Sequence, residues 1–346
     1  MKTQIKLLQA SIAALAVALT SQVSAQTTND PISTPIVGFQ KTTVPVGLST
    51  AGFPLLNPDL IKTSATSLSS NALTLSGETN VGAKLTAGDP YYIEVYTGSL
   101  KGDRFDVDTA ATISAANGSV ILNSSSGNNT YSVASIASSL DGQTIALRQH
   151  ITLDQIRQMA TPALVGNNSA NSADQIQLFN PLTKGYEQYF LRGDGVTWRK
   201  VGTVDVSTKV PVPPGVGVFI LKKTGVTDLI ATGAVRNNDF ARPLVTGLQL
   251  TAPGFPVDRS PQALGMTSSN GWTANNSANS ADQIQVYNPT TKGYDQYFLR
   301  SDGITWRKVG TLDSFTAAEL FSGGGGAFIS RKTADSESVI NNPIAQ

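Results

Sequence analysis

The chain of 346 residues carries 25 basic and 24 acidic side chains and one histidine, giving a formal net charge of +1. This balance excludes the strongly basic footprint of a nucleic-acid-binding protein, so no nucleic-acid partner is expected. The absence of cysteine excludes disulfides, thiolate metal sites and cysteine nucleophiles.

Residues 1–25 are predicted to be a secretory signal peptide. Two lysines precede an apolar run over residues 7–19, and the segment ends in VSA, which supplies the small residues that a signal peptidase requires. The apolar run is shorter than the roughly 20 residues that a membrane-spanning helix needs. We therefore expect export to the periplasm, the cell surface or the extracellular space, with a disordered leader over residues 26–35. No transmembrane segment is expected in the mature chain.

Residues 36–140 are predicted to form an N-terminal β-domain. Short β-branched and aromatic runs, such as YYIEVYT at 91–97, alternate there with turns rich in Ser, Asn and Gly. The stretch GLSTAGFP at 47–54 is a weak echo of GLQLTAPGFP at 247–256. This echo indicates that the region contains a diverged start of a module that is used again later in the chain.

Few helices are expected, and both candidates are short. The clearer one covers residues 152–159, where Thr152 is placed to be the N-cap and Gln155 the N3 partner of a capping box. The second covers residues 316–321, with the sequence TAAELF. Elsewhere, apolar runs broken by Gly, Asn, Asp, Ser and Pro favour strands.

A duplication dominates the second half of the chain. Residues 167–205 and 275–313 are identical at 32 of 39 positions, and the similarity extends to PGVGVFILKK at 214–223 and GGGGAFISRK at 323–332. The duplication predicts two tandem β-modules and a short tail, at 141–236, 237–340 and 341–346.

Each repeated block is predicted to be a three-stranded meander. In the first copy the strands are expected at 175–180, 186–192 and 196–201, joined by a loop containing Pro and Gly and by a tight Gly-Asp-Gly turn. The middle strand carries aromatic residues on both faces, so we expect it to be central. The predicted fold is therefore all-β, with tandem β-sandwich or barrel-like modules and few short helices.

The succession ADQIQ, TKGY, YFLR and TWRKVG resembles an uncharacterised family of exported β-rich proteins common in Verrucomicrobia and related bacteria. The stretch YYIEVYTGSLKGDRFDVD at 91–108 is similar to that family as well. The resemblance covers most of the mature chain and implies export and a β-rich fold. It implies no activity, because none is known for the family, and no site residue carries over.

The inventory of catalytic side chains is poor, and no catalytic residue is predicted. A Ser-His-Asp site would have to use His150, the single histidine, and the chain has no G-x-S-x-G elbow. A glycosidase needs only two carboxylates. Asp103, Asp106 and Asp108 in the segment GDRFDVD leave a hydrolase open as the weaker alternative.

The same three aspartates offer oxygen ligands that Ca²⁺ prefers. They lack the glycine and the distal glutamate of an EF-hand loop, and strand alternation places Asp103 on the face opposite Asp106 and Asp108. We predict no metal and no cofactor, with Ca²⁺ as the weaker alternative.

The repeats carry two pairs of matching aspartates, and both pairs are interpreted as structural. Asp174 and Asp282 are expected to cap the entry to a strand. Asp194 and Asp302 are expected to stabilise a tight turn.

Four aromatic residues are candidates for glycan binding: Trp198, Trp306, Tyr186 and Tyr294. Aromatic faces stack on sugar rings, and duplicated sites gain avidity. The alternative is that these rings fill the cores of the meanders, which is the usual role of such residues.

The preferred hypothesis is an exported, non-enzymatic structural or adhesive protein of the bacterial envelope or extracellular matrix. Its expected partners are copies of itself or other envelope components. The alternative is a carbohydrate-binding protein with duplicated aromatic sites, whose partner is a polysaccharide.

Overall fold

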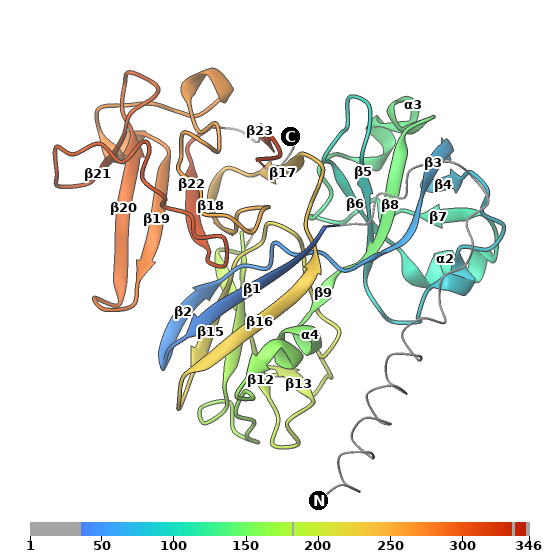
Figure 1. Ribbon diagram of the computed structural model, residues 1–346, viewed down its shortest axis with the longest axis horizontal. Helices are drawn as coiled ribbons and strands as arrows, with labels where there is room; N and C mark the ends of the chain where they lie inside the picture. The colour runs from blue at the N-terminus through green and yellow to red at the C-terminus, as the bar shows by residue number, and fades with distance from the viewer. Residues whose placement is uncertain (1–35, 182, 334–335, 344–346) are drawn as a thin grey trace, which may run out of the picture. The chain divides into compact units, whose positions relative to one another are not determined.

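The computed structural model describes residues 36–343 except 182 and 334–335 (Figure 1). The predicted signal peptide and the leader over residues 26–35 lie outside this range. Strands dominate the described chain, which confirms the predicted all-β fold.

The second repeat, here called module 2, forms two sheets. Its five-stranded sheet has the order β18-β22-β19-β20-β21, and β17 pairs with β23 in a second, two-stranded sheet. All pairings are antiparallel. The strands are β17 (Phe240–Leu244), β18 (Gly247–Thr251), β19 (Gln283–Asn288), β20 (Gly293–Leu299), β21 (Trp306–Lys308), β22 (Ala327–Arg331) and β23 (Ser336–Ile340). Its 3-10 turns are η3 (Ser268–Asn270) and η4 (Ala278–Ser280).

The first repeat, here called module 1, has the same topology. Its five-stranded sheet has the order β13-β12-β11-β15-β2, and β1 pairs with β16 as β17 pairs with β23. The strands are β1 (Val37–Val44), β2 (Gly47–Ala51), β11 (Gln175–Asn180), β12 (Gly185–Leu191), β13 (Trp198–Lys200), β15 (Val218–Lys222) and β16 (Thr227–Ala234). Small additional strands are β9 (Ile151–Thr152), β10 (Ala160–Thr161) and β14 (Pro211–Val212).

Module 1 is therefore discontinuous in sequence. β2 pairs with β15 from Gly47↔Lys222 to Ala51↔Val218, and its counterpart β18 pairs with β22 in the same way. The echo between residues 47–54 and 247–256 thus marks equivalent strands. The predicted domain boundary at residue 140 does not separate the sheets, because β15 of module 1 pairs with β2, which lies near the start of the described chain.

A six-stranded sheet is inserted between the two parts of module 1, in the order β6-β5-β8-β3-β4-β7. We call it the inserted domain. Its strands are β3 (Asp59–Ser69), β4 (Ala72–Leu75), β5 (Tyr91–Val95), β6 (Arg104–Val107), β7 (Ser119–Ile121) and β8 (Thr144–Gln149). Its helices are η1 (Gly82–Lys84), α2 (Thr109–Ala115), η2 (Val133–Ser135) and α3 (Ala137–Leu140). The apolar side chains of these elements form a core of their own.

The predicted helix at 152–159 is confirmed as α4 (Leu153–Met159). The Thr152 hydroxyl accepts a hydrogen bond from the Gln155 amide at 3.3 Å, and the Gln155 side chain accepts one from the Thr152 amide at 3.1 Å. This capping box satisfies two amides that would otherwise lack an intrahelical partner.

The predicted helix at 316–321 is wrong, since the chain turns there instead. Phe321 is buried, and its backbone forms two hydrogen bonds with Arg259, at 2.8 and 3.1 Å. A six-residue helix is marginal because nucleation is unfavourable, so these tertiary contacts decide the local conformation.

The two modules meet in a shared aromatic cluster. Phe179 and Phe219 from module 1 pack with Leu250 and Phe328 from module 2. Phe179 meets Phe328 edge to face at 5.2 Å between ring centroids. Each module also has a separate core between its own two sheets.

Candidate functional site

Asp174 and Asp282 are buried and occupy equivalent positions in the two modules. Asp174 Oδ2 accepts from the Val165 amide at 2.7 Å and lies 2.6 Å from Lys222 Nζ. Asp282 Oδ2 accepts from the Thr273 amide at 2.8 Å and lies 3.1 Å from Arg331 Nη1. Both carboxylates are therefore structural, as predicted, but each links the preceding loop to a buried cation of the neighbouring strand instead of capping the strand that follows it.

Asp194 and Asp302 stabilise the equivalent turns of the two meanders. Asp194 Oδ1 accepts from the amides of Val196 and Thr197 at 2.9 and 2.8 Å. Asp302 accepts two amides in the same way, at 3.0 and 2.8 Å. Hydrogen bonds from the Thr197 side chain and amide, together with the Val196 amide, lower the pKa of Asp194 to about 2. The structural interpretation of this pair is confirmed.

Trp198 and Trp306 do not present a stacking face, because both side chains are 0% exposed. Trp198 lies in the core of module 1 and Trp306 in the core of module 2. The Trp306 indole nitrogen donates to the Met266 carbonyl at 2.8 Å. These two residues therefore cannot stack on a sugar ring as predicted, because their side chains are buried in the module cores.

Tyr186 and Tyr294, by contrast, are 41% and 39% exposed. Burial raises the pKa of both phenols, and each phenol also contributes to the pKa shift of the other, so the two groups lie close together. Tyr186 packs against Phe219 at 5.8 Å and Tyr294 against Phe328 at 5.7 Å, each edge to face. The structure thus brings together two of the four predicted glycan-binding residues at the rim of the inter-module cluster.

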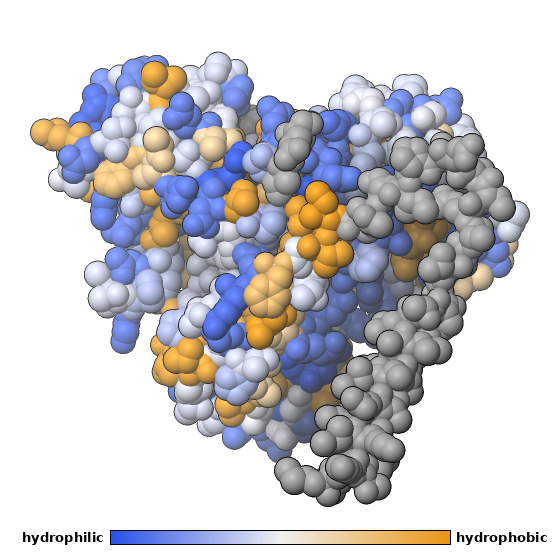
Figure 2. All heavy atoms as spheres, in the orientation of Figure 1, coloured by the Kyte–Doolittle hydropathy of each residue, from blue (hydrophilic) through white to orange (hydrophobic). Residues whose placement is uncertain are grey.

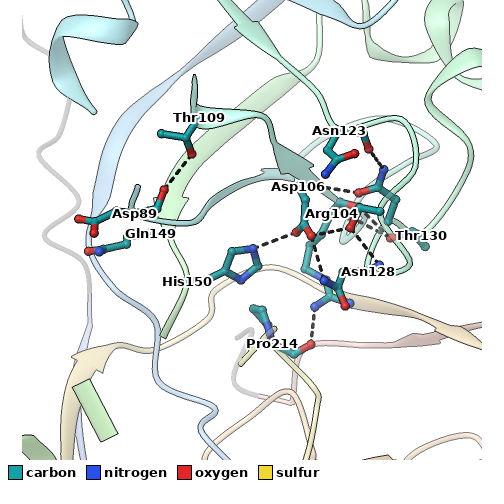
Figure 3. A network of polar contacts seen from close by, with 12 residues as sticks. Asp89, Arg104, Asp106, Thr109, Asn123, Asn128, Thr130, Gln149, His150 and Pro214 are labelled. Atoms are coloured by element: carbon teal, nitrogen blue, oxygen red, sulfur yellow. Dashed lines mark hydrogen bonds and ion pairs between the residues drawn. The ribbon is translucent and has the colours of Figure 1, made fainter. Parts of the chain in front are cut away.

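The carboxylates of the segment GDRFDVD have separate roles. His150 Nε2 lies 2.9 Å from Asp106 Oδ1, while Ser126 and Asn128 donate to Asp106 Oδ2 at 2.5 and 2.9 Å (Figure 3). Asp108 instead caps α2 by accepting from the Ala111 amide at 2.9 Å.

The carboxylate of Asp106 stays ionised from neutral pH down to strongly acidic pH. Burial raises its pKa, but the hydrogen bond and charge of His150 and the hydrogen bonds from Ser126 and Asn128 outweigh burial and lower the pKa to about 2. Across residues 36–343, gaps excepted, no group of three or more His, Asp or Glu side chains is arranged to hold a metal ion.

A cavity of about 530 Å³ lies where the inserted domain and both modules meet. The inserted domain contributes Arg104 and Asn128, module 1 contributes Phe179 and the segment 210–216, and module 2 contributes Arg242. Both arginines are buried. The sequence analysis did not predict this site. The local feature that could have indicated it is the arginine within the otherwise apolar strand FARPL of β17.

Within the described part of the chain, no helix is long and apolar enough to cross a membrane. Comparison of the chain with protein-family models, with curated proteins and with solved structures finds no match.

Proposed function

We propose that the protein is exported and acts, without catalysis, as a structural or adhesive component of the bacterial envelope or extracellular matrix. We propose further that it assembles by pairing with copies of itself. The observation that carries this proposal is the exposed edge of β1.

β1 is eight residues long, and among the described strands it pairs only with β16. Val37 and Phe39 on this strand are 71% and 66% exposed, and Ile36 precedes them at 60%. Figure 2 shows hydrophobic surface over β1 on the face that is turned towards the viewer. A long edge strand with exposed apolar residues is a template for strand pairing between chains.

Light scattering coupled to size-exclusion chromatography tests the assembly over a range of protein concentration. The proposal expects the mass to grow with concentration and expects Phe39→Lys to shift the mass towards the monomer, since edge lysines oppose pairing. Leu312→Lys is the matched control, because Leu312 is 86% exposed but lies outside β1. A monomer at every concentration would overturn self-assembly.

Export is tested by determining the N-terminus of protein recovered from the periplasm or the culture medium. The predicted cleavage after Ala25 places Gln26 at the mature N-terminus. Retention of the full leader in the cytoplasm would contradict the proposed location.

A second candidate function is polysaccharide binding, favoured by the meeting of Tyr186 and Tyr294 at the surface. Two half-exposed phenols at one rim offer aromatic surface and hydroxyl groups together, a combination that suits a polar ring. Co-sedimentation with insoluble polysaccharides should fall in the double variant Tyr186→Ala, Tyr294→Ala. Tyr131→Ala is the control, because Tyr131 is 39% exposed and belongs to the inserted domain. Equal loss in both variants would contradict a specific site.

A further inference from the structure

The cavity at the junction contains an arginine with an unusual environment. Arg242 lies on β17, lines the cavity and is only 4% exposed. Among the described residues, its Nε and Nη2 atoms have no hydrogen-bond partner. Burial lowers the pKa of Arg242 to about 9, and the nearby positive charges of Arg104 and Arg331 act in the same direction.

The carboxylates around this junction are already engaged. Glu187, the acidic residue of the cavity wall, lies 2.9 Å from Lys200 Nζ and accepts from the Tyr189 hydroxyl at 2.8 Å. Asp282 pairs with Arg331. In the described part of the chain, no carboxylate forms a salt bridge with Arg242.

Arg104, the second arginine of the cavity, is held by the protein itself. One of its nitrogens donates to the Pro214 carbonyl, as Figure 3 shows, and another donates to the Ala241 carbonyl at 3.1 Å. Its guanidinium also lies over the Phe240 ring, 4.6 Å from the centroid. Arg104 therefore adds positive potential to the cavity while Arg242 retains free donors.

The rest of the cavity wall is mainly apolar. Leu178, Phe179, Pro211, Pro213 and Leu250 supply aliphatic and aromatic surface. A buried cation without a counterion is unfavourable, and a guanidinium matches a carboxylate in charge and in the geometry of its donors. A ligand with one negative charge would compensate the single positive charge of Arg242. An apolar group beside that charge would pack against the apolar walls of the cavity.

We propose that the junction cavity binds a small organic monocarboxylate, with its acid group paired to Arg242 and its apolar body against the wall formed by Leu178, Phe179 and Leu250. A volume of about 530 Å³ is within the range of small-molecule sites and suits a single-ring acid. The cavity wall draws on the inserted domain and both modules, and the proposed pose contacts both modules. It is separate from the edge of β1 on which the proposed assembly depends.

The test uses the full mature protein and measures binding by calorimetry and by thermal shift. The probes are benzoate and cyclohexanecarboxylate, with benzamide as the uncharged analogue and phosphate and sulfate as inorganic anions. Saturable binding of the carboxylates with no response to benzamide is the expected result. Equal responses to benzamide, a response to inorganic anions only, or no response to either carboxylate at millimolar concentration would each overturn the proposal.

A further arm separates free acids from acids carried on a polysaccharide. A glucuronate-containing oligosaccharide offers the same carboxylate on a polar ring. Because the walls are apolar, the proposal expects it to bind more weakly than benzoate. Tighter binding of the oligosaccharide would overturn the assignment of an apolar body to the ligand.

Variants of Arg242 assign the binding to this cavity. Arg242→Met should weaken carboxylate binding by about 30-fold or more, since removing one partner of a buried charge pair costs about 2 kcal/mol or more. Arg242→Lys should retain a reduced response, because it keeps the charge without the fork of donors. Arg300→Met removes a guanidinium from module 2 that does not line the cavity, and it should bind as the wild type does.

The unliganded variant supplies an independent readout. Replacing an uncompensated buried cation by methionine should leave the melting temperature of the unliganded protein unchanged or raise it. A purely structural arginine would instead lower the melting temperature when removed. Loss of stability in Arg242→Met together with wild-type carboxylate binding in Arg242→Lys would therefore overturn the proposal, because it would make Arg242 a structural residue that does not bind the acid.

Discussion

Tyr186 and Tyr294 stand at equivalent positions of the two repeats, 108 residues apart, and their phenol groups lie close enough for each to shift the pKa of the other. The duplicated module therefore contacts its own copy through the same residue on each side. The aromatic cluster of Phe179, Phe219 and Phe328 lies against this pair. The contact has the self-complementary character of a twofold interface within one chain.

The first prediction is that the two phenol groups contribute one hydrogen bond to stability. Tyr186→Phe and Tyr294→Phe should each reduce the free energy of unfolding by about 0.5–1.5 kcal/mol, the usual net contribution of one hydrogen bond. The double variant should cost little more than either single variant, because both remove the same interaction. Denaturant unfolding measures all three variants against the wild type. Fully additive losses would contradict a direct contact between the two hydroxyl groups.

The second prediction compares the two buried indoles. Trp198→Ala and Trp306→Ala should each cost about 3–5 kcal/mol, because each leaves a large cavity in a module core. Trp306→Phe should cost about 1 kcal/mol more than Trp198→Phe, since the Trp306 indole donates to Met266 while the Trp198 indole nitrogen has no partner in the described part of the chain. Thermal melting of the four variants checks this. Unchanged melting of either alanine variant would contradict the core placement.

The third prediction concerns the buried ion pairs. Asp174→Asn should destabilise the protein by about 3–5 kcal/mol, because it leaves Lys222 buried without its counterion. Asp282→Asn should have a comparable effect through Arg331. Asp313→Asn, at an exposed loop position, is the control and should change little. Chemical denaturation of these variants gives the comparison, and wild-type stability of Asp174→Asn would show that the pair is dispensable.

The fourth prediction is a pH dependence that comes from Asp106. Its pKa is about 2 in the folded protein against an ordinary value of 3.8, so the folded state favours the ionised form. This stabilisation, about 2 kcal/mol, is fully present above about pH 4 and is lost as the pH falls towards 2.

The measurement is the free energy of unfolding of the wild type and of Asp106→Asn across this pH range. The difference between the two should be largest above about pH 4 and should shrink as the carboxylate of the wild type becomes protonated. The curve of Asp313→Asn should run parallel to that of the wild type. A difference that is constant from pH 6 to pH 2 would exclude Asp106 as the titrating group.

Local sequence alone determined several features correctly. The capping box of Thr152 and Gln155, the turns at Asp194 and Asp302, and the strands of the repeated block depend on groups a few residues apart. Hydrogen bonds over so short a distance, and the alternation of apolar residues along a strand, are encoded within each segment. The duplication likewise followed from comparing the chain with itself.

Only the tertiary structure decided how distant segments combine. The pairing of β2 with β15 joins segments separated by the whole inserted domain, and the sequence 316–321 turns because Phe321 is held by Arg259. Tertiary packing likewise decides that Trp198 and Trp306 are buried. It also decides that Arg242 lines a cavity formed by the inserted domain and the two modules. These outcomes depend on the packing of surfaces far apart in the chain, and no local pattern of residues specifies which surfaces will meet.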